Sequence, residues 1–276
     1  MQLLKRHNIF TFPAIPKNFK KAVINVIKTF LPILAIALFS AIFYPMFKAA
    51  PKKAAASVST LISTTTAHEA KNTVEARAIM ASTLLYDSLN LDQMGLSAEA
   101  LQYAYEGYLN LVERGAVNNT NVLTVCDFSQ SSKKKRMYII DVKNFKVLLN
   151  TYVAHGKNSG FDMAERFSNK MESLQSSLGF YVTKSTYNGK HGLSLKLDGQ
   201  EQGFNDKAEA RAVVVHGAEY IGDQRLGSGY MGRSFGCPAV PQQQAAKVIN
   251  YIKGGTCLFI YHPSANYLKS SRLLNA

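Results

Sequence analysis

The chain has 276 residues, which is enough for one core of ordinary size plus appendages. Its formal net charge of +14 is uneven, since residues 1–53 contain nine Lys or Arg and no acid, whereas the remainder has 23 basic and 18 acidic residues. An excess of positive charge at the N-terminus is typical of a segment that orients a chain in a membrane. No helix-turn-helix, zinc-finger or RNP pattern is present, so nucleic acid is not an expected partner.

The N-terminal stretch predicts a membrane anchor. Residues 1–28 are basic and are predicted to be cytoplasmic. Residues 29–47 carry no charge for 19 residues, close to the roughly 20 that cross a bilayer and longer than the about 7–15 of a signal-peptide core. We expect a transmembrane helix in the inner membrane with the rest of the chain in the periplasm. The alternative is a long signal sequence cut near residues 54–56, with export of the product.

An α-helical hairpin is predicted next, at residues 68–116. Residues 48–67, rich in Ala, Ser, Thr and Lys, read as a linker. Helical spacing then predicts one apolar face made of Val74, Ala78, Met80, Leu84, Leu85 and Leu89. Ser97 reads as the N-cap of a second helix that ends at Gly115. We expect the hairpin to pack against the following domain; a substrate-shaping or regulatory role is the alternative.

From Asn121 the apolar period changes to two, which predicts a mainly β domain over residues 119–265. The expected strands are Val122–Phe128, Met137–Val142, Lys146–Val153, Phe180–Lys184, Leu193–Leu197, Ala212–His216 and Leu258–Tyr261. Many short strands with Gly-rich connections indicate a β-sandwich or a barrel-like core. A helix is expected at Gln242–Lys253 and a C-terminal tail at 266–276. The basic run Lys133–Arg136 reads as a solvated surface.

The three cysteines differ in their surroundings. Cys126 and Cys257 lie in apolar strand-like runs and are predicted to be buried free thiols. Cys237 lies in a Gly-rich loop, between Gly236 and Pro238, and is the candidate for a reactive thiol. No cysteine or histidine spacing fits a metal site, and neither a metal nor an organic cofactor is expected.

A cysteine nucleophile needs a base and oxyanion donors, and the stretch from Arg211 to Pro241 offers both. The main-chain N–H groups of Gly236 and Cys237 are candidate donors. Three histidines precede a glycine, namely His155, His191 and His216, and position alone does not choose the base among them.

His216, seventeen intervening residues and then Ser234-x-Gly236-Cys237 resemble the signature of L,D-transpeptidases, the YkuD-like catalytic domain. The nearest resemblance is to murein L,D-transpeptidase catalytic domain proteins. Further blocks that carry it are V-C-D-F-S at 125–129, Y-V-A-H-G at 152–156, S-L-G-F-Y-V at 177–182 and G-K-H-G-L-S-L-K-L-D-G at 189–199.

The resemblance implies the chemistry of the site. Cys237 would be the nucleophile and His216 the general base, with the second imidazole nitrogen oriented by a main-chain carbonyl near Ser234. Ser234 and Gly236 would complete the catalytic loop. His155 is left as a structural residue. The substrate would be a tetrapeptide stem of peptidoglycan, cleaved before its terminal D-Ala and transferred through a thioester to an amine of another stem.

Substrate-binding residues follow from the same resemblance. His191 and Gly217 would line the cleft. Arg233 would bind a stem carboxylate or, equally, would be an exposed loop cation. Phe235 stands where the family often has histidine, and Pro238-Ala239-Val240 stands where many members have Arg or Asn, which leaves substrate preference open. Two alternatives remain, an L,D-carboxypeptidase that hydrolyses the same acyl-enzyme and a non-catalytic wall-binding module on a membrane tether.

Overall fold

The computed structural model describes residues 58–275, with side chains from Val74 onward, and these residues belong to one compact unit. The predicted cytoplasmic segment 1–28, the span 29–47 and the first part of the linker lie outside the described residues. Within the described range, no helix combines the length and the apolar character that a membrane crossing requires.

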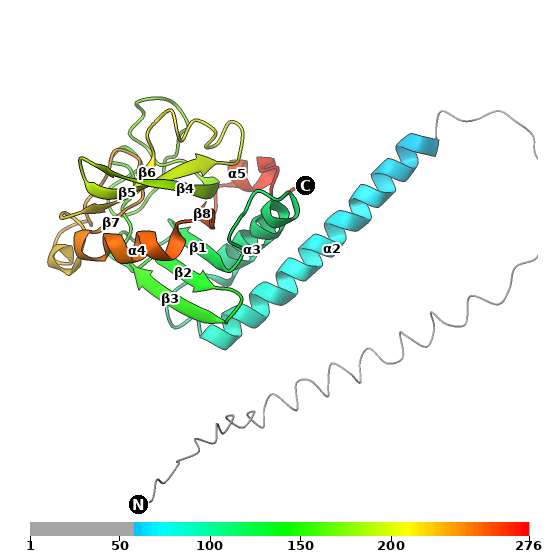
Figure 1. The fold of residues 1–276 in the computed structure, drawn as a ribbon, viewed down its shortest axis with the longest axis horizontal. Helices are drawn as coiled ribbons and strands as arrows, with labels where there is room; N and C mark the ends of the chain where they lie inside the picture. Colours follow the sequence, from blue (N-terminus) through cyan, green and yellow to red (C-terminus); the bar gives the residue numbers. More distant parts are fainter. Residues whose placement is uncertain (1–57, 276) are drawn as a thin grey trace, which may run out of the picture. The chain divides into compact units, whose positions relative to one another are not determined.

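The helical hairpin consists of α2 (Val58–Leu89) and α3 (Ala98–Glu113) (Figure 1). Helix α2 begins inside the segment predicted as a linker at 48–67, so that prediction is wrong for the residues from Val58 onward. Ala, Ser and Thr are compatible with a helix as well as with a linker, which is why composition misplaced the boundary. Ser97 caps α3 as predicted, since its side chain accepts a hydrogen bond from the Ala100 N–H.

The apolar face predicted for α2 is only partly correct. Val74, Ala78 and Leu85 are buried, but Met80 is 69% exposed and Leu84 is 57% exposed. At 3.6 residues per turn, positions 80 and 84 lie about 140° and about 100° around the helix from the centre of the buried set. The hairpin packs on the following domain through α3, as expected, and Gly107 lies so close to the Phe180 ring that an added Cβ would come within 2.1 Å of it.

Eight strands follow in the described residues; most bounds are within two residues of the predicted ones, but β4 extends five residues beyond the predicted end at Lys184. They are β1 (Val122–Asp127), β2 (Met137–Asp141), β3 (Lys146–Thr151), β4 (Gly179–Gly189), β5 (Gly192–Gly199), β6 (Val214–Ala218), β7 (Ala239–Pro241) and β8 (Cys257–Tyr261). Strand β7 was not predicted because three residues, preceded by Pro238 and ending at Pro241, are too few to show a period of two.

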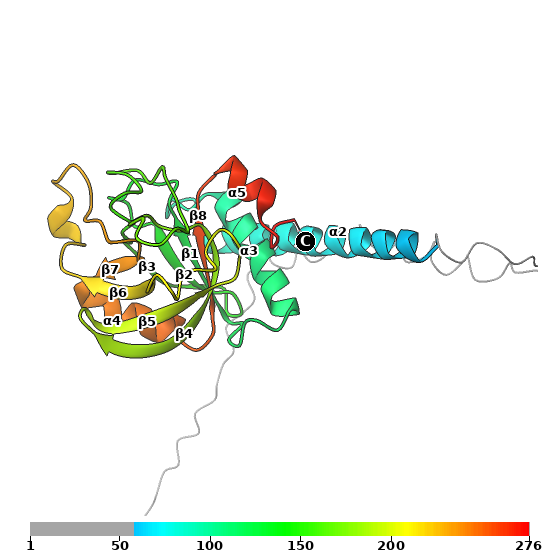
Figure 2. The same cartoon turned by 90° about the horizontal axis from the view of Figure 1, so that it is seen from above.

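The strands form one eight-stranded sheet in the order β3-β2-β1-β8-β4-β5-β6-β7, so the predicted two-sheet sandwich is wrong and the barrel-like alternative holds. The segment after β3 returns to β7, where the Ala154 N–H donates to the Ala239 carbonyl at 2.8 Å, and Gly156 forms a bridge with Ser234. Figure 2 shows the sheet curving so that its edge strands β3 and β7 approach each other. Closure of this kind leaves fewer unpaired backbone groups than two open sheets would.

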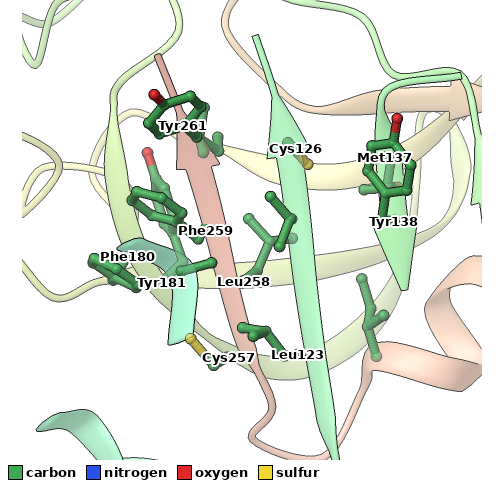
Figure 3. Packing of buried hydrophobic residues seen from close by; sticks show 14 of the residues in the cluster. Leu123, Cys126, Met137, Tyr138, Phe180, Tyr181, Cys257, Leu258, Phe259 and Tyr261 are labelled. Atoms are coloured by element: carbon green, nitrogen blue, oxygen red, sulfur yellow. The ribbon is translucent and has the colours of Figure 1, made fainter. Parts of the chain in front are cut away.

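The core lies on the central strands β1, β8 and β4 (Figure 3). The Phe180 and Phe259 rings stack with centroids 4.1 Å apart. Cys126 and Cys257 are fully buried free thiols, as predicted. Together they show that two of the three cysteines serve packing rather than chemistry.

The C-terminal end is more ordered than predicted. The expected helix at 242–253 is a 3₁₀ turn (Gln242–Gln244) followed by α4 (Ala245–Ile252). The segment predicted as a tail contains α5 (Ala265–Ser270), and Leu273 and Leu274 are buried. The buried Glu201 carboxylate accepts hydrogen bonds from Tyr267 at 2.7 Å and from Ser271, which ties this segment to the sheet. Because these hydrogen bonds join residues that are far apart in the chain, no local sequence pattern predicts them.

Candidate active site

The loop that carries Cys237 is a tight turn organised by Ser234. The Ser234 hydroxyl donates to the Cys237 carbonyl at 2.6 Å and accepts from the Gly236 N–H at 3.1 Å. Gly236 has φ +124°, and a Cβ added there would come within 2.8 Å of the Gln175 carbonyl oxygen. Only glycine fits this position without strain. Ser234 and Gly236 therefore shape the loop that presents the thiol.

Backbone hydrogen bonds to the neighbouring segment around His155 hold this loop in place. The Ser234 N–H donates to the His155 carbonyl at 3.0 Å, and the Lys157 N–H donates to the Ser234 carbonyl at 2.8 Å. His155 is fully buried, with Nδ1 2.8 Å from the Arg136 guanidinium. Burial, and secondarily Arg136, lower the pKa of His155 to about 4. His155 is thus a neutral structural residue, in agreement with the sequence interpretation.

The Cys237 thiol lies against the start of β6. Its Sγ is 3.5 Å from the Val214 N–H nitrogen and 3.6 Å from the Ala212 carbonyl oxygen. Burial raises the pKa of the Cys237 thiol, while the Val214 N–H and the Arg211 charge act in the opposite direction. Burial is the largest of these effects, so the surroundings favour the thiol over the thiolate.

His216 lies on β6 with its Nδ1 2.8 Å from the Gly217 carbonyl oxygen. Because a carbonyl can only accept, Nδ1 carries the proton and the Nε2 lone pair is free to act as a base. Burial lowers the pKa of His216, and His191 lowers it further, whereas the Gly217 carbonyl raises it. The orienting carbonyl belongs to Gly217, so the expectation of a carbonyl near Ser234 is wrong; the adjacent residue supplies it.

The sheet places His216 on β6 and Cys237 in the loop immediately before the neighbouring strand β7. His216 pairs with Ala239 in the parallel β6–β7 ladder, and Cys237 precedes Ala239 by two residues. Two residues of extended chain span about 7 Å, so the Cα atom of Cys237 is at most about that far from Ala239, which lies directly beside His216. Among residues 58–275 no hydrogen bond joins Sγ to the imidazole; the thiol instead faces the Ala212 carbonyl.

The substrate-cleft residues expected from the sequence lie beside this pair. The His191 ring, on the β4–β5 turn, stacks on His216 with centroids 4.4 Å apart. A cavity of about 420 Å³ is lined by Lys190, His191, Gly192, Gly217, Ala218, Glu219, Tyr220 and Gln242. A second cavity, of about 190 Å³, includes Ala212 and Val214, the two residues whose backbone contacts Sγ. One cavity is thus lined by His191 and Gly217, and the other by the residues whose backbone contacts Sγ.

Two arginines differ from their expected roles. Arg233 donates to the Lys157 and Gly160 carbonyls at 2.9 and 3.0 Å, so its guanidinium braces the loop. Arg211, which stands directly before the predicted strand Ala212–His216 and was given no role at the site, lies close to the Cys237 loop: its Nη2 would be 3.3 Å from a Cβ added at Gly236. The signal that could have found it is its basic character at the head of an otherwise apolar run.

One of the two N–H groups expected to bind the oxyanion is already engaged. The Gly236 N–H already donates to Ser234 Oγ, so it is not the free donor that was expected. The Cys237 N–H remains the candidate. Within residues 58–275 no group of three or more His, Cys, Asp or Glu side chains is placed to hold a metal ion.

Comparison with known proteins bears on this geometry. The comparison with curated proteins finds no significant match. Among solved structures, an L,D-transpeptidase from Mycobacterium smegmatis is 16% identical, with a TM-score of 0.32, over 51% of this chain and 59% of that chain. LdtMt1 in complex with imipenem is 15% identical, with a TM-score of 0.32 and the same coverages, so this chain spans less than two thirds of either structure. The sequence profile of the L,D-transpeptidase catalytic domain matches residues 92–261, more than half of the chain, and the protein therefore belongs to the L,D-transpeptidase catalytic-domain family.

Proposed function

We propose that this chain is a peptidoglycan L,D-transpeptidase with Cys237 as nucleophile and His216 as general base. The observation that carries the proposal is the Nδ1–H···O=C bond from His216 to Gly217, at 2.8 Å, which leaves Nε2 as a proton acceptor on the strand beside the thiol. A base whose tautomer is set by the main chain is what a thiol of raised pKa requires.

The reaction begins with rotation of the thiol from the Ala212 carbonyl toward the imidazole. His216 Nε2 takes the Sγ proton as sulfur attacks the carbonyl that precedes the terminal D-Ala of a tetrapeptide stem. The oxyanion lies against the Cys237 N–H. Collapse breaks the C–N bond, and the imidazolium returns the proton to the leaving amine. The second stem's amine then attacks the thioester, gives its proton to His216 and regenerates the thiol.

The proposed order of steps starts from a neutral Cys237 thiol and a neutral His216 imidazole. Burial raises the pKa of Cys237 and lowers that of His216, so both shifts disfavour a preformed ion pair. The thiolate then forms only as the bond to carbon forms. Such a site protects the thiol from oxidation between turnovers, because thiolate is the reactive species.

The cellular setting is part of the same proposal. The basic segment 1–28 followed by the uncharged segment 29–47 favours an inner-membrane anchor with the catalytic domain in the periplasm, or a cleaved signal with export. Either route delivers the domain to the cell envelope, where peptidoglycan stems are available as donor and acceptor. No cofactor is required by the chemistry above.

Intact mass of the full chain incubated with purified tetrapeptide stem tests the proposal, with Cys237→Ala as the matched control. We expect an adduct equal to the stem minus D-Ala in the unmodified protein and none in the variant. Adding a second stem separates transfer, which yields a cross-linked dimer, from hydrolysis, which identifies an L,D-carboxypeptidase. A folded protein that gives neither adduct nor product, and whose Cys237→Ala variant keeps full cellular function, is a wall-binding module instead.

A further inference from the structure

Three aromatic side chains near the Cys237 loop, the exposed Phe161 and Phe235 and the half-buried Tyr230, are here termed the aromatic rim. Phe235 is 71% exposed and Phe161 is 67% exposed. Phe235 lies two residues before Cys237 in the chain. Large aromatic side chains gathered on a surface mark interaction sites more often than single exposed residues do. The mechanism above uses none of the three.

Two cations connect the rim into one continuous surface. Lys157 Nζ lies 4.8 Å from the centre of the Phe235 ring. Arg233 lies 4.6 Å from the ring centres of both Phe161 and Tyr230, whose rings are 5.9 Å apart in an edge-to-face arrangement. Arg233 Nη1 in turn donates to the Lys157 carbonyl at 2.9 Å. The rings are therefore held in place by cation–π contacts rather than free to collapse onto the protein.

We infer that the aromatic rim binds the saccharide that carries the donor stem, an inference that rests on the proposed function. A sugar ring has an apolar C–H face that suits an aromatic ring, and a polar edge of hydroxyl and acetamido oxygens that suits Lys157 and Arg233 as donors. An apolar peptide would match the rings but not the cations. The site thus selects stems that are still attached to glycan.

The spacing agrees with this assignment. The attacked carbonyl belongs to the third residue of the tetrapeptide, so three residues separate it from the sugar, or about 10 Å when extended. Phe235 is two residues from Cys237, a reach of at most about 7 Å, and the Arg233 cluster lies one side chain farther along the rim. The chain separation between Phe235 and Cys237 therefore permits a contact between the rim and the sugar of a stem bound at the thiol.

A kinetic comparison of two donors tests the inference, one a disaccharide-tetrapeptide and the other the same tetrapeptide without sugar. We expect Phe161→Ala and Phe235→Ala each to lower kcat/KM on the sugar-bearing donor by on the order of fivefold, with little change on the free peptide. The matched control is Phe145→Ala, a phenylalanine 42% exposed in the turn before β3, which should change neither rate. Equal losses on both donors, or no loss at all, would overturn the inference.

A second measurement does not depend on catalysis. The chain contains no tryptophan, so the F235W variant carries a single reporter at the rim. We expect its fluorescence to shift saturably when the full chain is titrated with a peptide-free N-acetylglucosamine oligomer, whereas the F145W variant should not respond. If neither donor is turned over, the proposed function fails and this titration alone decides: a saturable shift supports a saccharide site, and a flat response removes it.

Discussion

Replacing Arg211 with methionine removes a cation from behind the nucleophile loop. The guanidinium donates to the carbonyls of Ser168 and Gln175, at 2.8 and 2.6 Å, and to the hydroxyls of Ser173 and Ser177. Each carbonyl left without a partner costs about 1–3 kcal/mol when buried, and partial solvent access reduces that cost. We therefore expect R211M to lower the free energy of unfolding by about 2–3 kcal/mol, measured by urea denaturation.

The same substitution should change the chemistry of the thiol. The Arg211 charge lowers the pKa of Cys237, so its removal raises that pKa and leaves less thiolate at any given pH. We expect the rate of Cys237 alkylation in R211M to rise at higher pH than in the unmodified protein. R211K keeps the charge but not the planar fork, so it should lose stability while keeping more of the alkylation profile. An R211M profile that overlays the original would refute the electrostatic reasoning.

Three further predictions concern the base, the loop and the hairpin. H191A removes a group that lowers the pKa of His216, so the acid limb of the kcat/KM profile should move to higher pH; an unmoved limb would contradict this. S234A removes two hydrogen bonds of the catalytic loop and should lower kcat on the order of tenfold or more, with stability reduced by about 1–2 kcal/mol; an unchanged kcat would mean that the loop needs no such support. G107A would place a Cβ 2.1 Å from the Phe180 ring, and we expect a loss of about 3 kcal/mol or more in urea unfolding; a loss below 1 kcal/mol would show that α3 can move away at little cost.

Local pattern was sufficient where the chain's neighbours in sequence are also its neighbours in space. The apolar runs at Val122–Asp127 and Met137–Asp141, which are buried along nearly their whole length, fall within one residue of their predicted bounds. Ser97 was identifiable as an N-cap because capping depends on residues three positions away. The order of His216 and Cys237 along the chain, with the blocks around them, was enough to indicate the family.

Several features needed the tertiary structure because they depend on partners far along the chain. Arg136, the last residue of a run that reads as solvated surface, is fully buried against the Val153 carbonyl at 3.1 Å. The closure of the sheet rests on the contact of Ala154 with Ala239, which no period in the sequence encodes. Such contacts satisfy backbone and charged groups that water would otherwise solvate, and only the assembled fold determines which ones meet.

The proposed catalytic pair, Cys237 and His216, shows the same division within a single site. The sequence by itself determined which residue types are available, a thiol in a Gly-rich loop and a histidine at the end of a β-branched run. The tertiary structure decided that the Gly217 carbonyl sets the tautomer of His216, and that Arg211 rather than Arg233 lies behind the nucleophile. Residue identity supplies the chemistry, whereas protonation and orientation depend on burial and on hydrogen-bond partners that folding brings together.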